Sequence, residues 1–285
     1  MHKKTIAIVT DKPKSVFNSS YLISYLIPLW QDRGHRVVIS TKWPFPDADV
    51  ALLHVDLTRV PLVYRLISKK YPVVLNGNFP DNSKAIVSQH LLKIEDHYAG
   101  PVIVKTNGNF GGMPDIAKSS KGDSRRVLNE TSNLETLNWH AIRAISPESY
   151  PVFRDKSDVP AGVWRNRHLV VEKFLPEYDG NGLYRMRACF LFGDQEVNMV
   201  VTSEKPVIKG SNICSRELLD EPAPEALRVL RKKLKIDFGR LDYAVSEGRV
   251  VLYDANKTAT LSRQSSLEWA DRVIRPLSHG IEKYL

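Results

Sequence analysis

The chain has 285 residues, of which 42% are hydrophobic and 26% charged, a composition typical of a globular protein with two or three small domains. No segment approaches the roughly 20 apolar residues of a membrane-spanning helix, so we expect no membrane partner. Cys189 and Cys214 are too few for a disulfide framework and lack metal-ligand spacing. Because the apolar run KTIAIV is also too short for a secretion signal, we predict a cytoplasmic protein.

The net charge of +9 raises the hypothesis of a nucleic-acid partner. The densest basic run, RVLRKKLK at 228–235, lies on an amphipathic pattern, which is typical of a solvated helix face. No interleaved aromatic residues or known nucleic-acid module accompany it. We therefore predict no nucleic-acid partner, and a basic surface suits an anionic small substrate such as a nucleotide.

Strand and helix patterns alternate over the first 80 residues. Apolar runs predict strands at 4–9, 36–40, 49–55 and 72–77. Helical spacing predicts one helix that begins near Tyr21, contains Pro28 and stops at Gly34, and a second helix over 61–71. Such alternation is typical of a parallel sheet covered on both faces. The pattern predicts a Rossmann-like unit without the GxGxxG fingerprint of a dinucleotide site.

The remaining chain has a different texture. Residues 78–100 predict a linker and one helix, and residues 116–150 are polar and irregular. Strand patterns follow at 168–175, 184–194, 195–203, 237–248 and 249–256, and helix patterns lie around 224–234 and in the last twenty residues, as one helix or as two split at Pro276. Several strands are joined by Gly-Asp or Glu-Gly turns. The pattern predicts an α+β domain built on an antiparallel sheet.

The segment RLDYAVSEGRVVLYDANKT (240–258) is the strongest candidate for chemistry. Antiparallel pairing of its two strands brings Asp242 close to Asp254 and Asn256, which share one face. Three hard oxygen ligands suit Mg²⁺ holding phosphate oxygens, and Arg240 shares the face of Asp242, where it can neutralise a transferring phosphoryl group. The alternative is a set of ordinary polar residues at hairpin ends. Unpaired carboxylates among apolar neighbours would be costly, which favours a metal site.

Two further stretches are weak signals when each is taken alone. In PVIVKTNGNFGGMPD (101–115) a strand ends on Lys105 and continues into a glycine loop, which is either a surface turn or a cradle for phosphates. It is not the GxxxxGK[ST] loop, because the lysine precedes the glycines. In VVEKFLPEYDG (170–180) a strand stops at Pro176, and such a connector can offer backbone groups to an adenine edge.

In this order, the lysine and glycine loop, the EKFL connector, the R-x-D strand and the D-x-N strand resemble the ATP-grasp superfamily, which includes D-alanine–D-alanine ligase, glutathione synthetase and RimK-like ligases. The resemblance covers residues 80–258. It implies an α/β and α+β fold, with a Rossmann-like pre-ATP-grasp domain at 1–80. A small ATP-grasp subdomain with the glycine-rich loop follows at 81–174, and a C-terminal antiparallel-sheet subdomain at 175–285 carries the magnesium site.

The resemblance also implies roles for individual residues. The residues implied to contact the ATP phosphates are Lys105, the loop residues Thr106, Asn107, Gly111 and Gly112, and, as the earlier lysine, Lys84. Those implied to contact adenine or ribose are Glu172, Lys173, Phe174, Leu175 and Asp179. Those implied to bind one or two Mg²⁺ ions, for which Mn²⁺ can substitute, are Asp242, Asp254 and Asn256, with Arg240 facing the phosphate. Asp254 stands where glutamate is usual in the superfamily.

The activity implied by the resemblance is ATP-dependent ligation. A carboxylate is activated as an acylphosphate and attacked by an amine or thiol, in peptide or natural-product assembly. Arg185 and Arg187 alternate on one strand face and are predicted to hold the carboxylate. Lys205 and Lys209 are loop lysines that either reach the phosphates or are solvated. An ATP-grasp kinase and a non-catalytic ATP-binding protein stay open as alternatives, and the superfamily contains dimers, although no residue here indicates a homodimer.

Overall fold

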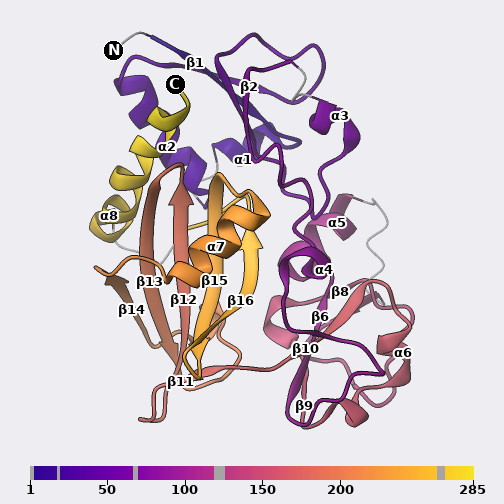
Figure 1. The fold of residues 1–285 in the computed structure, drawn as a ribbon. Coiled ribbons are helices and arrows are strands. Elements are labelled where there is room, and N and C mark those ends of the chain that lie inside the picture. Colours follow the sequence, from indigo (N-terminus) through magenta and orange to yellow (C-terminus); the bar gives the residue numbers. More distant parts are fainter. Residues whose placement is uncertain (1–2, 18–19, 67–69, 119–125, 262–266) are drawn as a thin grey trace.

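The computed structural model describes residues 3–17, 20–66, 70–118, 126–261 and 267–285. Figure 1 shows three parts: an N-terminal sheet at the top, a large sheet beneath it, and a smaller subdomain to one side. Helices α2 (Leu22–Asp32) and α8 (Leu267–Ser278) lie side by side at the junction of the first two parts. Within the described ranges, no helix is long and apolar enough to cross a membrane.

The N-terminal sheet is parallel, as predicted. Its strand order is β2-β1-β3-β4, with bounds β1 Thr5–Val9, β2 Arg36–Ser40, β3 Val50–Leu53 and β4 Val73–Leu75. Alternate residues of β1 enter two different cores because side chains alternate across a strand. Ile6 and Ile8 pack with α2, whereas Ala7 and Val9 pack with Tyr64 on the opposite face. The short helices of this region are α1 (Pro13–Val16) and α3 (Leu62–Arg65).

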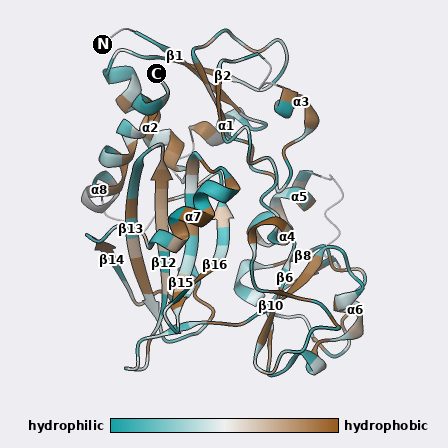
Figure 2. Cartoon of the chain, in the orientation of Figure 1, coloured by the Kyte–Doolittle hydropathy of each residue, from teal (hydrophilic) through white to brown (hydrophobic). Residues whose placement is uncertain are grey.

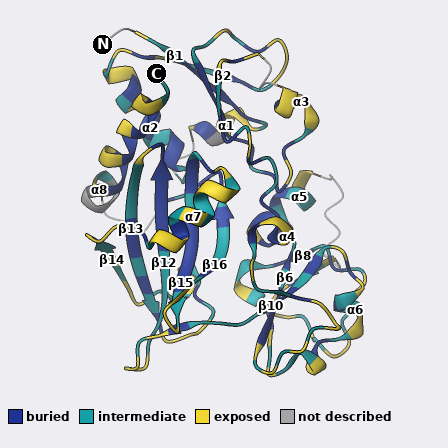
Figure 3. Ribbon diagram, viewed as in Figure 1, coloured by how far each residue is buried: buried dark blue, intermediate teal, exposed yellow. Residues whose placement is uncertain are grey.

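The large sheet is antiparallel, which confirms the sequence prediction. Its order is β14-β13-β12-β15-β16, and β11 pairs with β12. The bounds are β11 Glu177–Tyr178, β12 Tyr184–Phe192, β13 Gln195–Ser203, β14 Ser215–Leu219, β15 Phe238–Ser246 and β16 Arg249–Asn256. One face packs against α2 and α8, and α7 (Glu225–Leu234) covers the other. Figure 3 shows buried residues along β12 and β15 and an exposed outer surface on α7.

The small subdomain has a four-stranded sheet of order β5-β10-β6-β9 and its own hydrophobic core. The strands are β5 Leu91–Leu92, β6 Val102–Thr106, β9 Val152–Phe153 and β10 Leu169–Lys173, and a parallel pair is formed by β7 Val127–Leu128 and β8 Ala144–Ile145. Its helices are α4 Lys84–Val87, α5 Met113–Lys118 and α6 Ala161–Trp164. Figure 2 shows that hydrophobic residues concentrate on its strands and that the connecting segments are largely hydrophilic.

Two predicted elements differ from the structure, one strand was not predicted, and the structure decides between the two alternatives for the C-terminal helix. The helix predicted over 61–71 is helical at Leu62–Arg65, and residues 67–69 lie outside the described residues. The segment 78–100 holds the four-residue α4 and the short strand β5 instead of one longer helix. Strand β14 was not predicted, because SRELL lacks an apolar alternation. Pro276 lies inside α8 and does not split it.

Candidate active site

A cleft with a volume of about 270 Å³ is lined by residues of the small sheet and of the large sheet. Six of its lining residues are lysine or arginine and four are aspartate or glutamate, so the cleft has an excess of positive charge. The charged lining residues are Lys84, Lys105, Lys173, Arg185, Lys209, Arg240, Glu148, Glu172, Asp242 and Asp254. An excess of cations in a partly closed cleft favours an anionic ligand.

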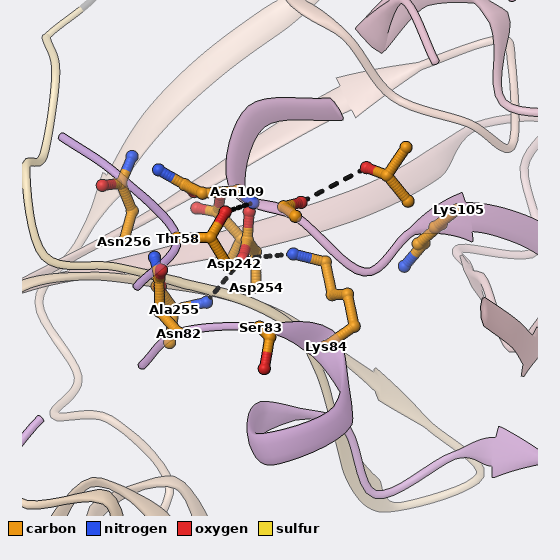
Figure 4. Close-up of polar contacts among 12 residues, drawn as sticks. Thr58, Asn82, Ser83, Lys84, Lys105, Asn109, Asp242, Asp254, Ala255 and Asn256 are labelled. Atoms are coloured by element: carbon orange, nitrogen blue, oxygen red, sulfur yellow. Dashed lines mark hydrogen bonds and ion pairs between the residues drawn. The ribbon is translucent and has the colours of Figure 1, made fainter. Parts of the chain in front are cut away.

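Two carboxylates face each other across the β15–β16 ladder. Asp242 and Asp254 are paired in register, which confirms that the hairpin brings them together. Nη2 of Arg240 donates to Oδ2 of Asp242 at 2.8 Å, and Nζ of Lys84 donates to Oδ1 of Asp254 at 2.7 Å. Figure 4 shows the Lys84 side chain reaching from α4 toward Asp254. Each carboxylate is therefore matched by one cation.

The pair of Lys84 and Asp254 is charged. Burial alone would raise the pKa of Asp254, but the ammonium of Lys84 outweighs burial and holds that pKa below its usual value. Burial also opposes the charge of Lys84, and the carboxylate of Asp254 raises its pKa above the ordinary value. The side chain of Lys84 is 5% exposed, so solvent screens this interaction little.

A β-bulge aims a tyrosine into the cleft. The register shifts after Asp242, so Tyr243 pairs with Leu252 and Tyr253 is the extra residue. The hydroxyl of Tyr253 donates to the carbonyl of Leu175 at 2.8 Å, and Nζ of Lys105 lies 5.4 Å from the centre of its ring. Tyr253 thus links β16, the strand that carries Asp254, to the connector after β10.

The lysine at the end of β6 is paired with the glutamate of the EKFL segment. Lys105 lies opposite Val170 on the neighbouring antiparallel strand, which makes Glu172 its diagonal neighbour on the same face. Nζ of Lys105 lies 2.6 Å from Oε2 of Glu172, while Oε1 of Glu172 is buried without a hydrogen-bond partner. An unsatisfied carboxylate oxygen in a cleft is available to a ligand donor such as an amino group.

Two backbone N–H groups at the end of β10 form hydrogen bonds within the protein. The N–H of Lys173 donates to the carbonyl of His90, and the N–H of Phe174 donates to the carbonyl of Pro101, both at 2.9 Å. Lys173 and Phe174 line the cleft, whereas Leu175 does not. The N–H of Phe174, which the sequence predicted for adenine, therefore already has a partner in the structure.

Lys209 is a cleft residue that the sequence did not rank. Its Nζ lies 4.2 Å from the centre of the Tyr150 ring, and both residues line the cleft. Burial and the nearby charge of Lys105 lower the pKa of Lys209 to about 8, and burial raises the pKa of Tyr150 to about 12. The sequence of the loop around 205–210 contains no motif that marks Lys209 as a ligand-binding residue. A lysine in a loop is more often solvated.

The titration of Lys209 gives a testable pH dependence. The ammonium is present at pH 7 and is lost as the pH rises through about 8, so affinity for ATP, the ligand that the sequence resemblance implies, should fall by up to about tenfold between pH 7 and pH 9. Calorimetric titration at both pH values measures this loss in the wild type and in Lys209→Met. The variant shares the titration of ATP itself but lacks the ammonium, so its affinity should change less. Parallel pH profiles would show that Lys209 does not contact the nucleotide.

Several predicted residues are not among those that line the cleft. Arg187 donates to Glu177 from Nη2 at 2.7 Å and from Nε at 3.0 Å. Oδ1 of Asn256 accepts from the backbone N–H and the hydroxyl of Thr258 at 2.9 and 3.1 Å. Asp179 accepts from the N–H groups of Asn181 and Leu183, which forms a local turn. The other predicted residues outside the cleft lining are Thr106, Asn107, Gly111, Gly112 and Leu175.

The glycine loop is held in a left-handed conformation against the small subdomain. Phe110, Gly111 and Gly112 have φ values of 43°, 66° and 75°, a region that glycine adopts readily. A Cβ on Gly111 would lie 2.1 Å from the carbonyl oxygen of Ile145. Phe110 is 60% exposed and lines the cleft. The two glycines thus permit a close approach that presents Phe110 at the cleft.

Thr58 of the N-terminal domain fixes the same loop. Its hydroxyl accepts from the N–H of Asn109 at 2.7 Å and donates to the carboxylate of Asp115 at 2.5 Å (Figure 4 shows the contact with Asn109). The amide of Asn109 also lies 3.5 Å from Asp56. Sequence patterns could not identify Thr58, because a threonine after a strand has no distinguishing signal.

Replacing Thr58 with valine should loosen this loop. The substitution keeps the side-chain shape but leaves the buried N–H of Asn109 without its acceptor, at a cost of about 1–3 kcal/mol. We expect faster hydrogen exchange at residues 106–113 and weaker ATP binding, with the global fold retained. Thr260→Val, at a half-buried position on the chain after β16, serves as the control. Unchanged exchange in the loop would show that Thr58 does not hold it.

Asp242 and Asp254 fit a magnesium ion by the chemistry of their donors. Both offer hard carboxylate oxygens from adjacent positions on neighbouring strands. Oδ1 of Asp242 is buried and accepts no hydrogen bond, although Nε of Arg240 lies 2.8 Å away. Within the described residues, no group of three or more His, Cys, Asp or Glu side chains could hold a metal ion. The candidate site therefore has two carboxylates, and further ligands would come from bound phosphate, water or Asn256.

A scan against protein-family models and a search of curated protein sequences found no match. Solved structures do match the fold over nearly the whole chain. D-alanine–D-alanine ligase from Bacillus anthracis has a TM-score of 0.52 at 14% identity, covering 99% of this chain and 96% of that chain. A RimK domain ATP-grasp protein from Sphaerobacter thermophilus has a TM-score of 0.51 at 12% identity, covering 97% and 98%. The ATP-grasp ligase PsnB, complexed with a phosphomimetic variant of a minimal precursor, Mg and ADP, has a TM-score of 0.54 at 11% identity, covering 99% of both chains.

The chain therefore has the fold of these ATP-grasp proteins, which confirms the fold class predicted from sequence. Its parallel N-terminal sheet and antiparallel C-terminal sheet are the ones that the sequence predicted.

Proposed function

We propose that the protein is an ATP- and Mg²⁺-dependent ligase that activates a carboxylate for attack by an amine or thiol. The observation that carries the proposal is the cleft itself, in which the pairs Lys84–Asp254, Lys105–Glu172 and Arg240–Asp242 surround one cavity. The solved D-alanine–D-alanine ligase was also crystallised with ATP, and PsnB with Mg and ADP, which supports nucleotide and metal binding in this fold.

We assign one set of cleft residues to the nucleobase and another set to the phosphates and the metal. Glu172, Lys173 and Phe174 from the end of β10 would bind the nucleobase, where the free Oε1 of Glu172 accepts a hydrogen bond. Lys84, Lys105 and Lys209 would neutralise the phosphates. Asp242 and Asp254 would hold Mg²⁺, which supplies charge neutralisation at the phosphate oxygens when it is bound. Arg240 lies beside Asp242 and would face the transferring phosphoryl group.

The chemistry needs little covalent participation from the protein. In-line positioning of the carboxylate and neutralisation of charge account for most of the catalysis of phosphoryl transfer. A carboxylate oxygen attacks the γ-phosphorus, ADP leaves, and the amine or thiol then displaces phosphate from the acylphosphate. Arg185 lines the cleft and would orient the carboxylate, whereas Arg187 would act indirectly because it is paired with Glu177.

A kinase that stops after phosphoryl transfer is the second candidate, because the same cleft would serve both reactions. The test is a coupled ADP-release screen over small carboxylates, amines and thiols, with Lys105→Met as the control. ADP release that requires both a carboxylate and an acceptor supports the ligase. A stable phosphorylated product with one substrate supports the kinase. ATP binding without turnover under every combination would contradict both.

A further inference from the structure

A second cavity, of about 800 Å³, shares the glycine loop as one wall. We call it the basic pocket. Its lining residues are Thr58, Arg59, Ser83, Asn107, Gly108, Gly112, Asp115, Ile116, Arg126, Arg143, Arg167 and His168. None of them lines the nucleotide cleft, and the two cavities adjoin at the loop between β6 and α5 and at the neighbouring residues Ser83 and Lys84.

The backbone of the small subdomain gathers the arginines at one place. Parallel pairing of β7 and β8 sets Val127 opposite Ala144, and the N–H of Arg143 donates to the carbonyl of Arg126 at 2.8 Å. Arg126 and Arg143 therefore lie side by side, each directly before its strand. Arg167 and His168 precede β10, and the carbonyl of His168 accepts from the N–H of Asn107 at 2.8 Å. The pocket is thus built from ordered strand ends.

The charges of Arg143 and Arg167 are not balanced by carboxylates that line the basic pocket. Asp115 is the one acidic residue among the lining residues, and Thr58 donates to it. Arg59 is paired with Asp81 at 2.9 Å. Within the described ranges of the chain, no carboxylate forms an ion pair with Arg143 or Arg167. Burial and these two guanidinium groups lower the pKa of His168, which shows that they share its surroundings.

We infer that the basic pocket binds a small anion that carries two or more carboxylate or phosphate groups. Guanidinium groups pair with carboxylate and phosphate oxygens bidentately, and two of them close together select a ligand with more than one anionic group. A cavity of about 800 Å³ has the size of a small-molecule site.

The inference goes beyond the proposed ligase, because none of the residues that the proposal assigns to the nucleotide, the metal or the carboxylate lines the basic pocket. Asn107, Gly108 and Gly112 form part of its wall, and the same loop presents Phe110 to the nucleotide cleft. An anion in the basic pocket would contact the loop from the side opposite to ATP. Binding at the two sites is then coupled through one segment.

Calorimetry with two probe anions tests the inference, with tricarballylate supplying carboxylates and inorganic pyrophosphate supplying phosphates. Four proteins are compared without Mg²⁺ and at low salt: the wild type of 285 residues, Arg143→Gln/Arg167→Gln, Lys105→Met and Arg272→Gln. Arg272 is an exposed residue of α8, so Arg272→Gln is the control. We expect at least one probe to bind the wild type with a Kd below about 1 mM. The double variant should bind at least about tenfold more weakly, while Arg272→Gln stays within about twofold.

Lys105→Met separates the basic pocket from the nucleotide cleft. If the anion binds in the basic pocket, its affinity survives Lys105→Met. Loss of binding in Lys105→Met with retention in Arg143→Gln/Arg167→Gln would place the anion in the nucleotide cleft and overturn the inference. Absence of binding for both probes, or equal affinities in all four proteins, would also overturn it. An unchanged thermal unfolding midpoint of the double variant shows that it folds, so a loss of affinity is then due to the pocket.

Discussion

Asp254→Asn should lower the rate of ADP release by about 100-fold or more. The substitution keeps the size of the side chain but removes a hard anionic oxygen from the candidate metal site, and loss of one electrostatic contact at a transition state typically costs 10²–10³-fold. The measurement is kcat in the reaction that the ADP-release screen identifies. Asp220→Asn, on an exposed aspartate after β14, is the matched control and should leave kcat unchanged.

The same variant should also lower stability, and a second substitution separates the two effects. Asp254→Asn leaves the ammonium of Lys84 buried without its partner, at a cost of about 3 kcal/mol. Lys84→Met/Asp254→Asn removes both charges, so urea unfolding should show recovered stability while ADP release stays lost. If Asp254→Asn retains full ADP release, Asp254 does not bind the metal. If the double variant is no more stable than the single one, the pair is not the source of the lost stability.

Gly111→Ala should displace the glycine loop and weaken ATP binding by more than about tenfold. The new methyl group would lie 2.1 Å from the carbonyl oxygen of Ile145, at a residue whose φ is already +66°. The left-handed conformation costs an alanine about 1–2 kcal/mol, and the contact adds a further cost that only movement of the loop relieves. Calorimetric titration with ATP and thermal unfolding measure the two effects.

Gly248→Ala is the control that separates conformation from contact. Gly248 has a φ of +74° but no atom within 4 Å of an added Cβ, so it shares only the conformational cost. We expect Gly248→Ala to lose about 1 kcal/mol with normal ATP binding. Equal effects of the two substitutions would contradict the close packing of the loop on Ile145.

The sequence predicted the elements whose pattern is local. The strands of the parallel sheet alternate with helices, and β12, β13, β15 and β16 have long apolar patterns with clear turns. Strand β14 was missed because it is an edge strand with a largely polar sequence, and only its pairing with β13 makes it a strand. The predicted helix between 78 and 100 became α4 and β5, because long-range pairing of β5 with β10 overrides local preference.

The candidate site shows the same division. The facing of Asp242 and Asp254 follows from a hairpin, so spacing in the sequence predicted it. Lys209, Tyr150 and Thr58 come from irregular segments, and only the tertiary fold brings them to the cleft or the loop. The sequence also did not predict that Asn256 is absent from the cleft lining. Its side chain accepts a hydrogen bond from Thr258, which lies beyond the end of the strand. Arg187 likewise has a partner, Glu177, on a strand whose pairing no local pattern indicates.

One hydrophobic core spans the N-terminal sheet and the large sheet, since Ile6 and Ile8 belong to the same cluster as Phe190 and Val273. The small subdomain has a separate core. The first two parts therefore share one buried apolar interface, and residues 1–80 expressed alone would leave the face of Ile6 and Ile8 open to water. The small subdomain joins the rest of the chain at two connections, one before α4 and one between β10 and β11.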